Sequence, residues 1–230
     1  MAAVLLFIVL LSGCKADVDD LSGKVFSFPE ESDTSHVKLS ANTQTPISAM
    51  TLCLRFFSEQ HRGQSLFSLA TPSHDNNLLL FKPHQLGKYR VHVEGADLDF
   101  FGLPDDKNGW NSVCWTWQSG SGLTQLWVNG KRSVRAFLRA NLSITGKPSV
   151  ILGQEQDTYG GGFHMKQSFV GDITDVHLWD RVLSPCEIRL YIEGKSFAPG
   201  NVLNWRALEY ASEGNVFVEM SDFHSVICKN

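Results

Sequence analysis

The chain has 230 residues and a formal net charge of -4, which fits one large β-sandwich or two small domains. Its slightly acidic balance gives no electrostatic reason to expect nucleic-acid binding. The histidines are scattered and include no His-Glu-x-x-His sequence, so a zinc-protease centre is not expected.

Residues 1–16 are typical of a secretory signal peptide. An apolar core at 4–11 is too short to span a bilayer, and we expect cleavage after Ala16. The sequence ending at Cys14 also fits a bacterial lipoprotein signal, which we rank below simple secretion. No later segment is long and apolar enough to be transmembrane, so residues 17–230 are predicted to form one secreted, extracellular domain.

Four cysteines remain once the signal peptide is removed: Cys53, Cys114, Cys186 and Cys228. An even number in a secreted chain predicts two disulfides, although the residues alone leave their pairing open. Asn141 begins an N-glycosylation sequon, for which the alternative interpretation is an unmodified loop.

Alternating apolar residues and β-formers predict a series of short strands along the chain. In chain order they are expected at 24–28, 36–39, 51–57, 65–70, 78–81, 89–93, 98–101, 112–118, 123–128, 131–138, 149–152, 168–173, 175–179, 201–205 and 216–219. Residues 71–77 are expected to be a turn, and Asn129-Gly130 is a strong hairpin signal.

Only residues 184–193 are predicted to be helical, because Ser184 can cap the helix and Glu187 completes a capping box. Many strands, one helix and no break in composition predict a single all-β sandwich. Five tryptophans could form a sugar-stacking surface, although core packing is the favoured role for most of them. They are Trp115, Trp117, Trp127, Trp179 and Trp205.

An acidic loop at 151–162 follows an apolar strand end and carries the strongest functional signal. In an extended segment Glu155 and Asp157 point to the same side, roughly 7 Å apart. With the amides of Gln154 and Gln156 and with main-chain carbonyls, they form an oxygen-rich cluster of the kind that calcium prefers.

Other interpretations of the acidic loop stay open. A surface loop with two solvated acids is about as probable on local sequence alone. Some sandwich glycosidases carry paired carboxylates on one strand, but a third acid would be needed where this chain has Gly160. The loop lacks the acids of a helix-loop-helix calcium site.

Residues 113–119 resemble the signature of the short pentraxins, His-x-Cys-x-Ser/Thr-Trp-x-Ser/Thr, with Ser112 in place of the histidine. Segments 28–34, 151–157 and 201–208 are also similar to family segments, and the likeness runs from about 23 to 219. The family is animal and secreted, which favours secretion over a lipoprotein.

The resemblance implies a two-sheet antiparallel jelly-roll sandwich with one short helix, assembled as a cyclic homopentamer. It also implies a non-enzymatic, calcium-dependent lectin of innate immunity and the acute phase. Its ligands would be phosphocholine, phosphoethanolamine or carbohydrate, with complement components as further partners. The rival interpretations are a laminin-G-like adhesion module and a sandwich-fold glycosidase.

Site residues follow from the same resemblance. One calcium would be held by Asp75, Asn76, Glu155, Asp157 and the main-chain carbonyl of Gln156. A second would share Glu155 and Asp157 and add Gln167, but His164 replaces a family acid, so its occupancy is doubtful. Phe81 would form the apolar wall of the ligand pocket, and Asp97 would meet a choline ammonium.

The family pattern also implies a Cys53–Cys114 disulfide. Cys186 and Cys228 have no counterpart in human members of the family, and we expect them to pair with each other and fix the C-terminal tail to the helix. A bond between subunits is the alternative.

Overall fold

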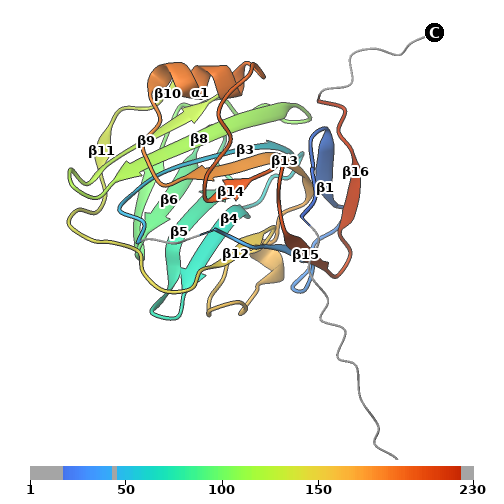
Figure 1. The fold of residues 1–230 in the computed structure, drawn as a ribbon. Coiled ribbons are helices and arrows are strands. Elements are labelled where there is room, and N and C mark those ends of the chain that lie inside the picture. The colour runs from blue at the N-terminus through green and yellow to red at the C-terminus, as the bar shows by residue number, and fades with distance from the viewer. Residues whose placement is uncertain (1–17, 43–45, 224–230) are drawn as a thin grey trace, which may run out of the picture.

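The computed structural model describes residues 18–42 and 46–223, which form two packed antiparallel β-sheets with one helix outside (Figure 1). The nine-stranded sheet has the order β10 (Lys131–Arg132), β9 (Leu123–Val128), β8 (Trp110–Gln118), β3 (Ala49–Phe57), β13 (Gly171–Trp179), β1 (Lys24–Phe28) and β16 (Phe217–Met220), with β11 (Ala136–Phe137) on β9 and β14 (Leu203–Asn204) on β13. The seven-stranded sheet has the order β15 (Tyr210–Glu213), β2 (His36–Leu39), β12 (Ser149–Leu152), β4 (Gln64–Thr71), β5 (His74–Lys82), β6 (Tyr89–Val93) and β7 (Ala96–Phe100).

The core lies between the two sheets and is filled by alternate side chains of both. Leu52, Leu54 and Trp115 face it from the nine-stranded sheet, and Leu80 and Val91 face it from the seven-stranded sheet. Because successive strand residues point to opposite faces, the other side chains of the seven-stranded sheet form its outer surface. The predicted all-β sandwich with one short helix is confirmed.

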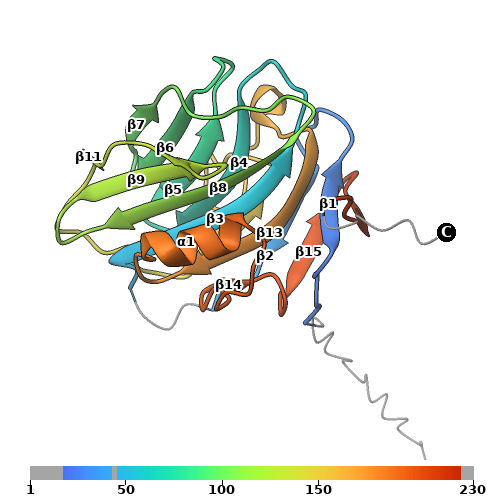
Figure 2. The ribbon, with the colours of Figure 1, turned by 90° about the horizontal axis from the view of Figure 1, so that it is seen from above.

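Helix α1 (Pro185–Ile192) covers the outer face of the nine-stranded sheet, over β3 and β13 (Figure 2). The predicted capping box is present: the Ser184 hydroxyl accepts from the Glu187 amide, and the Glu187 carboxylate accepts from the Ser184 amide. Ile188 and Tyr191 are buried against the sheet. All five tryptophans expected in the core are buried, which excludes an exposed stacking row made from them.

The Cys53–Cys114 disulfide lies beneath α1. The two residues are directly opposite each other on β3 and β8, and both are fully buried. Cys186 is exposed and bonds to no other cysteine in the described ranges. Cys228 lies outside the described residues, as do residues 1–17 with the expected signal peptide, so both expectations stay predictions.

Arg55 on β3 holds the end of α1 from inside the protein. It is fully buried, and its Nε donates to the Asp175 carboxylate at 2.9 Å. Its Nη atoms donate to Ser112 and to the carbonyls of Tyr191 (2.5 Å) and Ile192 (3.3 Å). A buried guanidinium therefore satisfies carbonyls that a helix C-terminus leaves unpaired.

Several predicted boundaries are wrong. The strands expected at 168–173 and 175–179 are one strand, β13, interrupted by an irregularity between Thr174 and His177. Asp175 there has a φ of 52°, so the strand bends without ending. The expected turn at 71–77 is shorter, because β5 already begins at His74. The return strand expected at 131–138 is two short pieces, β10 and β11, and β15 was not predicted.

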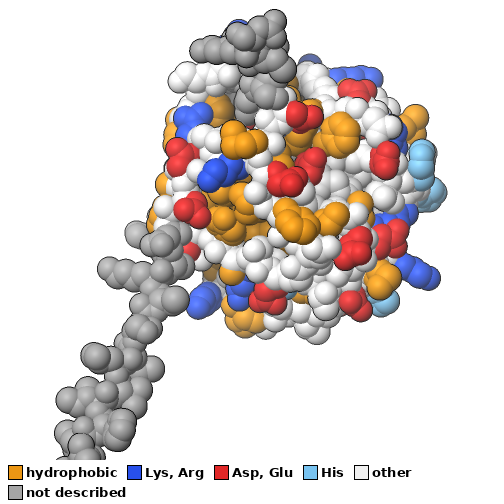
Figure 3. Space-filling view, turned by 90° about the vertical axis from the view of Figure 1, so that its right-hand side faces the viewer, with side chains coloured by type: hydrophobic (Ala, Val, Ile, Leu, Met, Phe, Trp, Pro, Cys, Tyr) orange, Lys and Arg blue, Asp and Glu red, His pale blue; other side chains and the backbone are white. Residues whose placement is uncertain are grey.

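One edge of the nine-stranded sheet is unusually apolar. Phe217, Val218 and Met220 on β16 are exposed, and Figure 3 shows this end of the molecule with hydrophobic side chains between acidic ones. No helix within the described ranges is long and apolar enough to cross a membrane.

Candidate functional site

The acidic loop leaves β12 at the end that lies away from the β4–β5 turn, because Ser149, at the other end of β12, pairs with Ala70 (Figure 1). Its later part, residues 157–159, lies beside that turn. Gly153 starts it with a φ of 87°, and a Cβ there would lie 2.4 Å from the Phe28 ring. Only glycine fits both the left-handed backbone and this close approach. The chain therefore turns sharply as soon as β12 ends, and Gln156 comes back to β4 and β12, where its side chain donates to the carbonyls of Ser68 and Ser149.

Two glutamine side chains brace the loop. Gln154 Nε2 donates to the carbonyls of Ser32 (2.7 Å) and Ser35 (3.0 Å). Gln156 Nε2 donates to Ser149 O at 3.1 Å, and its Oε1 accepts from the Gly160 amide at 2.9 Å. Both side chains are fully buried. The side-chain amide of Gln156 is therefore used in hydrogen bonds that hold the loop. The resemblance implies that its main-chain carbonyl is the ligand.

Glu155 is the centre of the site. Its side chain is buried although it carries a carboxylate. Oε1 accepts from Nδ2 of Asn76 on β5 at 3.5 Å, and Oε2 accepts from Nε2 of Gln167 at 2.5 Å. Gln167 ends a short 3-10 helix, Met165–Gln167. Three predicted ligands from three separate segments therefore meet.

The charge of Glu155 is poorly stabilised. Burial raises the pKa of its carboxyl, and the nearby carboxylates of Asp157 and Asp75 raise it further. The hydrogen bonds from Asn76 and Gln167 lower the pKa and so oppose this effect. Asp157 is exposed and Asp75 half-buried, so the structure brings two further carboxylates close to the buried carboxylate of Glu155.

The residues present fit a hard cation. Asn76 Oδ1 is buried and has no hydrogen-bond partner, a costly state for an amide oxygen. A cation would occupy that oxygen and reduce the repulsion among the carboxylates. Within the described ranges no three His, Cys, Asp or Glu side chains could hold a metal by themselves, so amide or carbonyl oxygens must complete any such site.

An open hollow lies between the β4–β5 turn and the acidic loop. It is lined by Thr71, Pro72, Ser73, His74, Asp75, Asp157, Thr158 and Tyr159. Two of the predicted ligands, Asp75 and Asp157, are among these residues, so an ion bound by them would be accessible to solvent.

His164 precedes the 3-10 helix and is exposed. Its carbonyl accepts from the Gln167 amide at 2.8 Å, and its side chain makes no capping hydrogen bond. The third carboxylate expected at the second calcium position is therefore replaced by an imidazole that faces solvent.

The region where the ligand pocket was predicted contains a cation, Arg90, that the sequence analysis did not identify. Phe81 on β5 is half-buried, and its strand partner on β6 is Arg90. Arg90 binds Asp99 in a bidentate pair (2.7 and 2.9 Å) and lies 3.7 Å from Asp97. The hydrogen bonds from Arg90 lower the pKa of Asp99 to about 2. His92 stands opposite Asp97. The two-residue turn expected at 94–95 and the alternation of the flanking strands could have predicted from sequence that Arg90 lies opposite Asp99.

Asn141, the predicted glycosylation residue, is exposed with a φ of 57°. Its amide donates to Ser119 O at 2.9 Å, which fixes the backbone and leaves the side chain accessible. Its modification stays a prediction.

These features define a two-sheet domain with a candidate oxygen-lined cation site. The chain matches the family model described as the Pentaxin family over residues 24–220, and it belongs to that family. It is 45% identical to C-reactive protein of Sus scrofa over 219 residues, covering 95% of this chain and 96% of that protein. It is 43% identical to serum amyloid P-component of Sus scrofa over 205 residues, covering 87% and 88%.

A solved structure shares the fold. The native heptameric SAP-like pentraxin from Limulus polyphemus matches with a TM-score of 0.81 at 22% identity, covering 90% of this chain and 99% of that chain. Family membership makes this chain a pentraxin-type recognition protein of innate immunity and not an enzyme. Its homologues in general bind calcium, form oligomers and are secreted.

The raised pKa of Glu155 predicts a stability effect with a definite sign. A raised folded-state pKa means that the folded protein holds this proton more tightly than the unfolded chain. With chelator present, this contribution to stability should therefore be lost as pH rises through the Glu155 pKa. Glu155→Gln should be more stable than the parent at pH 7 in chelator, but should gain less from added calcium. Thermal unfolding with and without calcium measures both.

Glu187 is the matched control for this experiment. Hydrogen bonds from Arg181 and then from Ser184 lower its pKa to about 2. Glu187→Gln should therefore lower stability at pH 7, the opposite sign. If Glu155→Gln also loses stability in chelator, the repulsion argument is wrong.

A carboxylate at position 164 should strengthen the second ion site. Calcium affinity rises with the number of charged ligands, so His164→Glu should bind calcium roughly tenfold more tightly, about 1.4 kcal/mol. Calorimetry measures the affinity and the number of ions. His84→Glu is the charge-matched control, because His84 is exposed beyond the end of β5 that is far from Asp75. Two ions bound with similar, tight affinity by the parent would contradict this prediction.

Proposed function

We infer that this chain is a secreted, calcium-dependent pattern-recognition lectin for phosphocholine, phosphoethanolamine or carbohydrate groups on surfaces. The observation that supports it most is the convergence of Asn76, Glu155 and Gln167 around a buried carboxylate, with one amide oxygen of Asn76 unpaired. Asp75, Asn76, Glu155, Asp157 and the carbonyl of Gln156 would hold the first ion. Bound calcium would neutralise these acids and offer open coordination positions to ligand oxygens.

The chain's own residues would orient the ligand. Gln154 and Gln156 fix the loop through buried amides, so its carboxylates are held in place before the ligand arrives. Phe81 offers an apolar wall beside the site. Arg90 lies close enough to contribute to the local potential, and its pKa is raised mainly by its hydrogen bonds to Asp99, with a smaller contribution from Glu155.

Arg90 changes what the pocket should prefer. Asp97 was predicted to meet a choline ammonium, but Arg90 lies 3.7 Å from it and partly compensates its charge. This supports recognition mainly through the phosphate or sugar oxygens, with a weaker contribution from an ammonium group. Phosphoethanolamine, phosphocholine and carbohydrate therefore all remain candidate ligands.

Family membership weighs against both rival interpretations. A laminin-G-like adhesion module and a sandwich glycosidase were compatible with the strand pattern, but the family match covers nearly all the described residues. The fold itself is shared widely among binding modules, so function here rests on the site and the family together.

A cyclic homopentamer is the proposed assembly. An edge strand with exposed apolar side chains, such as β16, is normally covered. A ring would cover it and would present several weak sites to one surface. Complement components are proposed as further partners on the basis of the family resemblance.

Calcium-dependent retention is the direct test of this function. The parent should bind phosphocholine or agarose resin in calcium and elute with chelator. Asp157→Ala should behave in calcium as the parent does in chelator, with a loss of at least about tenfold, because it removes a ligand that both ions would share. Asp180→Ala, an exposed acid near α1, is the control and should be retained. Retention of the parent in chelator would overturn the proposal.

Light scattering tests the assembly separately. A mass of five subunits is expected at micromolar concentration, and the pair Phe217→Glu and Met220→Glu should reduce it by placing charges in an apolar contact. Leu86→Glu, an exposed leucine in the β5–β6 turn, should leave the mass unchanged. A parent protein that is monomeric at this concentration would contradict the ring.

A further inference from the structure

The short 3-10 helix that carries Gln167 has little of its own to hold it in place. It spans three residues, Met165–Gln167, none of which is buried, and its N-cap residue His164 makes no side-chain capping hydrogen bond. A 3-10 turn of this length has poor hydrogen-bond geometry and is weak by itself. The position of Gln167 beside Glu155 must therefore be fixed largely by contacts with other segments.

Arg62, in the loop between β3 and β4, supplies such contacts. Its Nη1 donates to the carbonyls of Lys166 (3.3 Å) and Ser168 (2.5 Å), the residues on either side of Gln167. Its Nη2 donates to the Ser168 hydroxyl at 3.4 Å. One planar guanidinium therefore holds the backbone both before and after the predicted ligand.

Glu31 orients Arg62. The Glu31 carboxylate accepts from Arg62 Nε at 2.8 Å, and the Arg62 side chain is 21% exposed. Arg62 Nη1 also donates to the carbonyl of Gly63 at 3.0 Å. Because the five donors of a guanidinium lie in one fixed plane, fixing Nε also fixes the direction of the Nη atoms. Glu31 therefore acts on Gln167 through Arg62.

The segment that carries Glu31 also contacts the acidic loop. The Ser32 carbonyl accepts from Gln154 Nε2 at 2.7 Å, and the Ser32 amide donates to the Ser168 hydroxyl at 3.3 Å. That hydroxyl in turn donates to the carbonyl of Met165 at 2.7 Å. Residues 31 and 32 are thus connected to the chain both before and after the predicted ligands, and they support the site from outside it.

We propose that Arg62, oriented by Glu31, is a positioning residue of the candidate cation site and holds Gln167 against Glu155. The inference rests on the proposed calcium function, in which Gln167 is a ligand. Gln167 Nε2 donates to Glu155 Oε2 at 2.5 Å, so its side-chain amide lies beside the carboxylate that both ions would share. Groups that orient metal ligands without binding the metal change its affinity by about 10–100-fold when they are removed.

Calorimetry of the full chain with calcium chloride tests this role. Arg62→Met should weaken calcium binding roughly tenfold, although removing a positive charge near a cation would by itself strengthen binding. Arg62→Lys keeps the charge without the planar fork, so its affinity should lie between those of the parent and Arg62→Met. In a Gln167→Ala background, Arg62→Met should have no further effect, because the residue that it positions is gone. Equal losses in both backgrounds would overturn the proposal.

A second measurement needs no calcium. Lys166 is exposed, so a lysine-specific protease can cut after it whenever the 3-10 turn opens. In chelator, the fragment that begins at Gln167 should appear faster from Arg62→Met than from the parent. Equal cleavage and equal calcium binding by the two proteins would overturn the role of Arg62 alone, whereas a parent that binds no calcium would overturn the proposed function itself.

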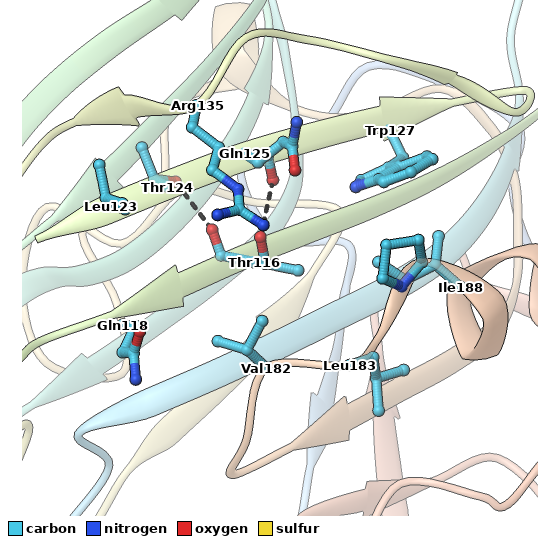
Figure 4. A pocket seen from close by; sticks show the side chains of 11 residues that line it. Thr116, Gln118, Leu123, Thr124, Gln125, Trp127, Arg135, Val182, Leu183 and Ile188 are labelled. Carbon is cyan, nitrogen blue, oxygen red and sulfur yellow. Dashed lines mark hydrogen bonds between the residues drawn. The ribbon is translucent and has the colours of Figure 1, made fainter. Parts of the chain in front are cut away.

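Two arginines outside the site are the controls. Arg181 also pairs with a glutamate, Glu187, at 2.6 Å, and Arg135 lines a groove between β9 and α1 (Figure 4). Arg181→Met and Arg135→Met remove the same charge as Arg62→Met, so neither should weaken calcium binding or speed cleavage after Lys166. If both behave as Arg62→Met does, the effect is a general one of charge or stability, and the proposal is wrong.

Discussion

A buried carboxylate in an acidic neighbourhood is the constraint on which the functional end of this protein depends. Glu155 is buried and lies near Asp75 and Asp157. Its two carboxylate oxygens accept hydrogen bonds from the side-chain amides of Asn76 and Gln167. A buried carboxylate beside other carboxylates is unfavourable unless its charge is paired, hydrogen-bonded or bound to a cation. Gly153 allows the turn, and Gln154 and Gln156 anchor the loop to neighbouring backbone. Much of the local sequence therefore stabilises a charge arrangement that the fold alone would not favour.

The strand pattern was readable from sequence wherever one strand face is buried. The bounds of β1, β2, β6, β9 and β12 match the prediction because alternation and turn residues agree there. The capping box likewise located α1 correctly. β15 was missed because three of its four residues are exposed, so no apolar alternation marks it. β13 was divided in two because a bulge at Asp175 resembles a strand end in sequence.

The site could be predicted only in part. Spacing alone indicated Glu155 and Asp157, since both lie on one loop. Asn76 and Gln167 come from other segments, and only the family resemblance connected them to Glu155. The Arg90–Asp99 pair follows from the register of β6 with β7, which the short turn at 94–95 sets. This contact was therefore predictable in principle from the turn, unlike the contacts of Asn76 and Gln167 with Glu155.

The two sheets carry different features of the protein. The acidic loop follows β12 of the seven-stranded sheet, whereas the nine-stranded sheet carries α1, the Cys53–Cys114 disulfide and Arg55. Arg55 is buried with its donors directed at Asp175 and at helix carbonyls, so removing it would take a hydrogen-bond partner from each of these groups. Substitutions around α1 should therefore change the stability of the fold, and substitutions in the acidic loop should change ion binding.

A weak ion site would be sufficient for the proposed function. Repulsion among Asp75, Glu155 and Asp157 favours ion binding, but His164 leaves the second position one carboxylate short. Extracellular calcium modules work with dissociation constants of about 10⁻⁴ to 10⁻³ M, so high affinity is not required there. A ring that presents several such sites gains strength from simultaneous attachment to a surface. Each proposed site would then release a single soluble ligand readily, while the proposed assembly would stay bound where ligands are dense.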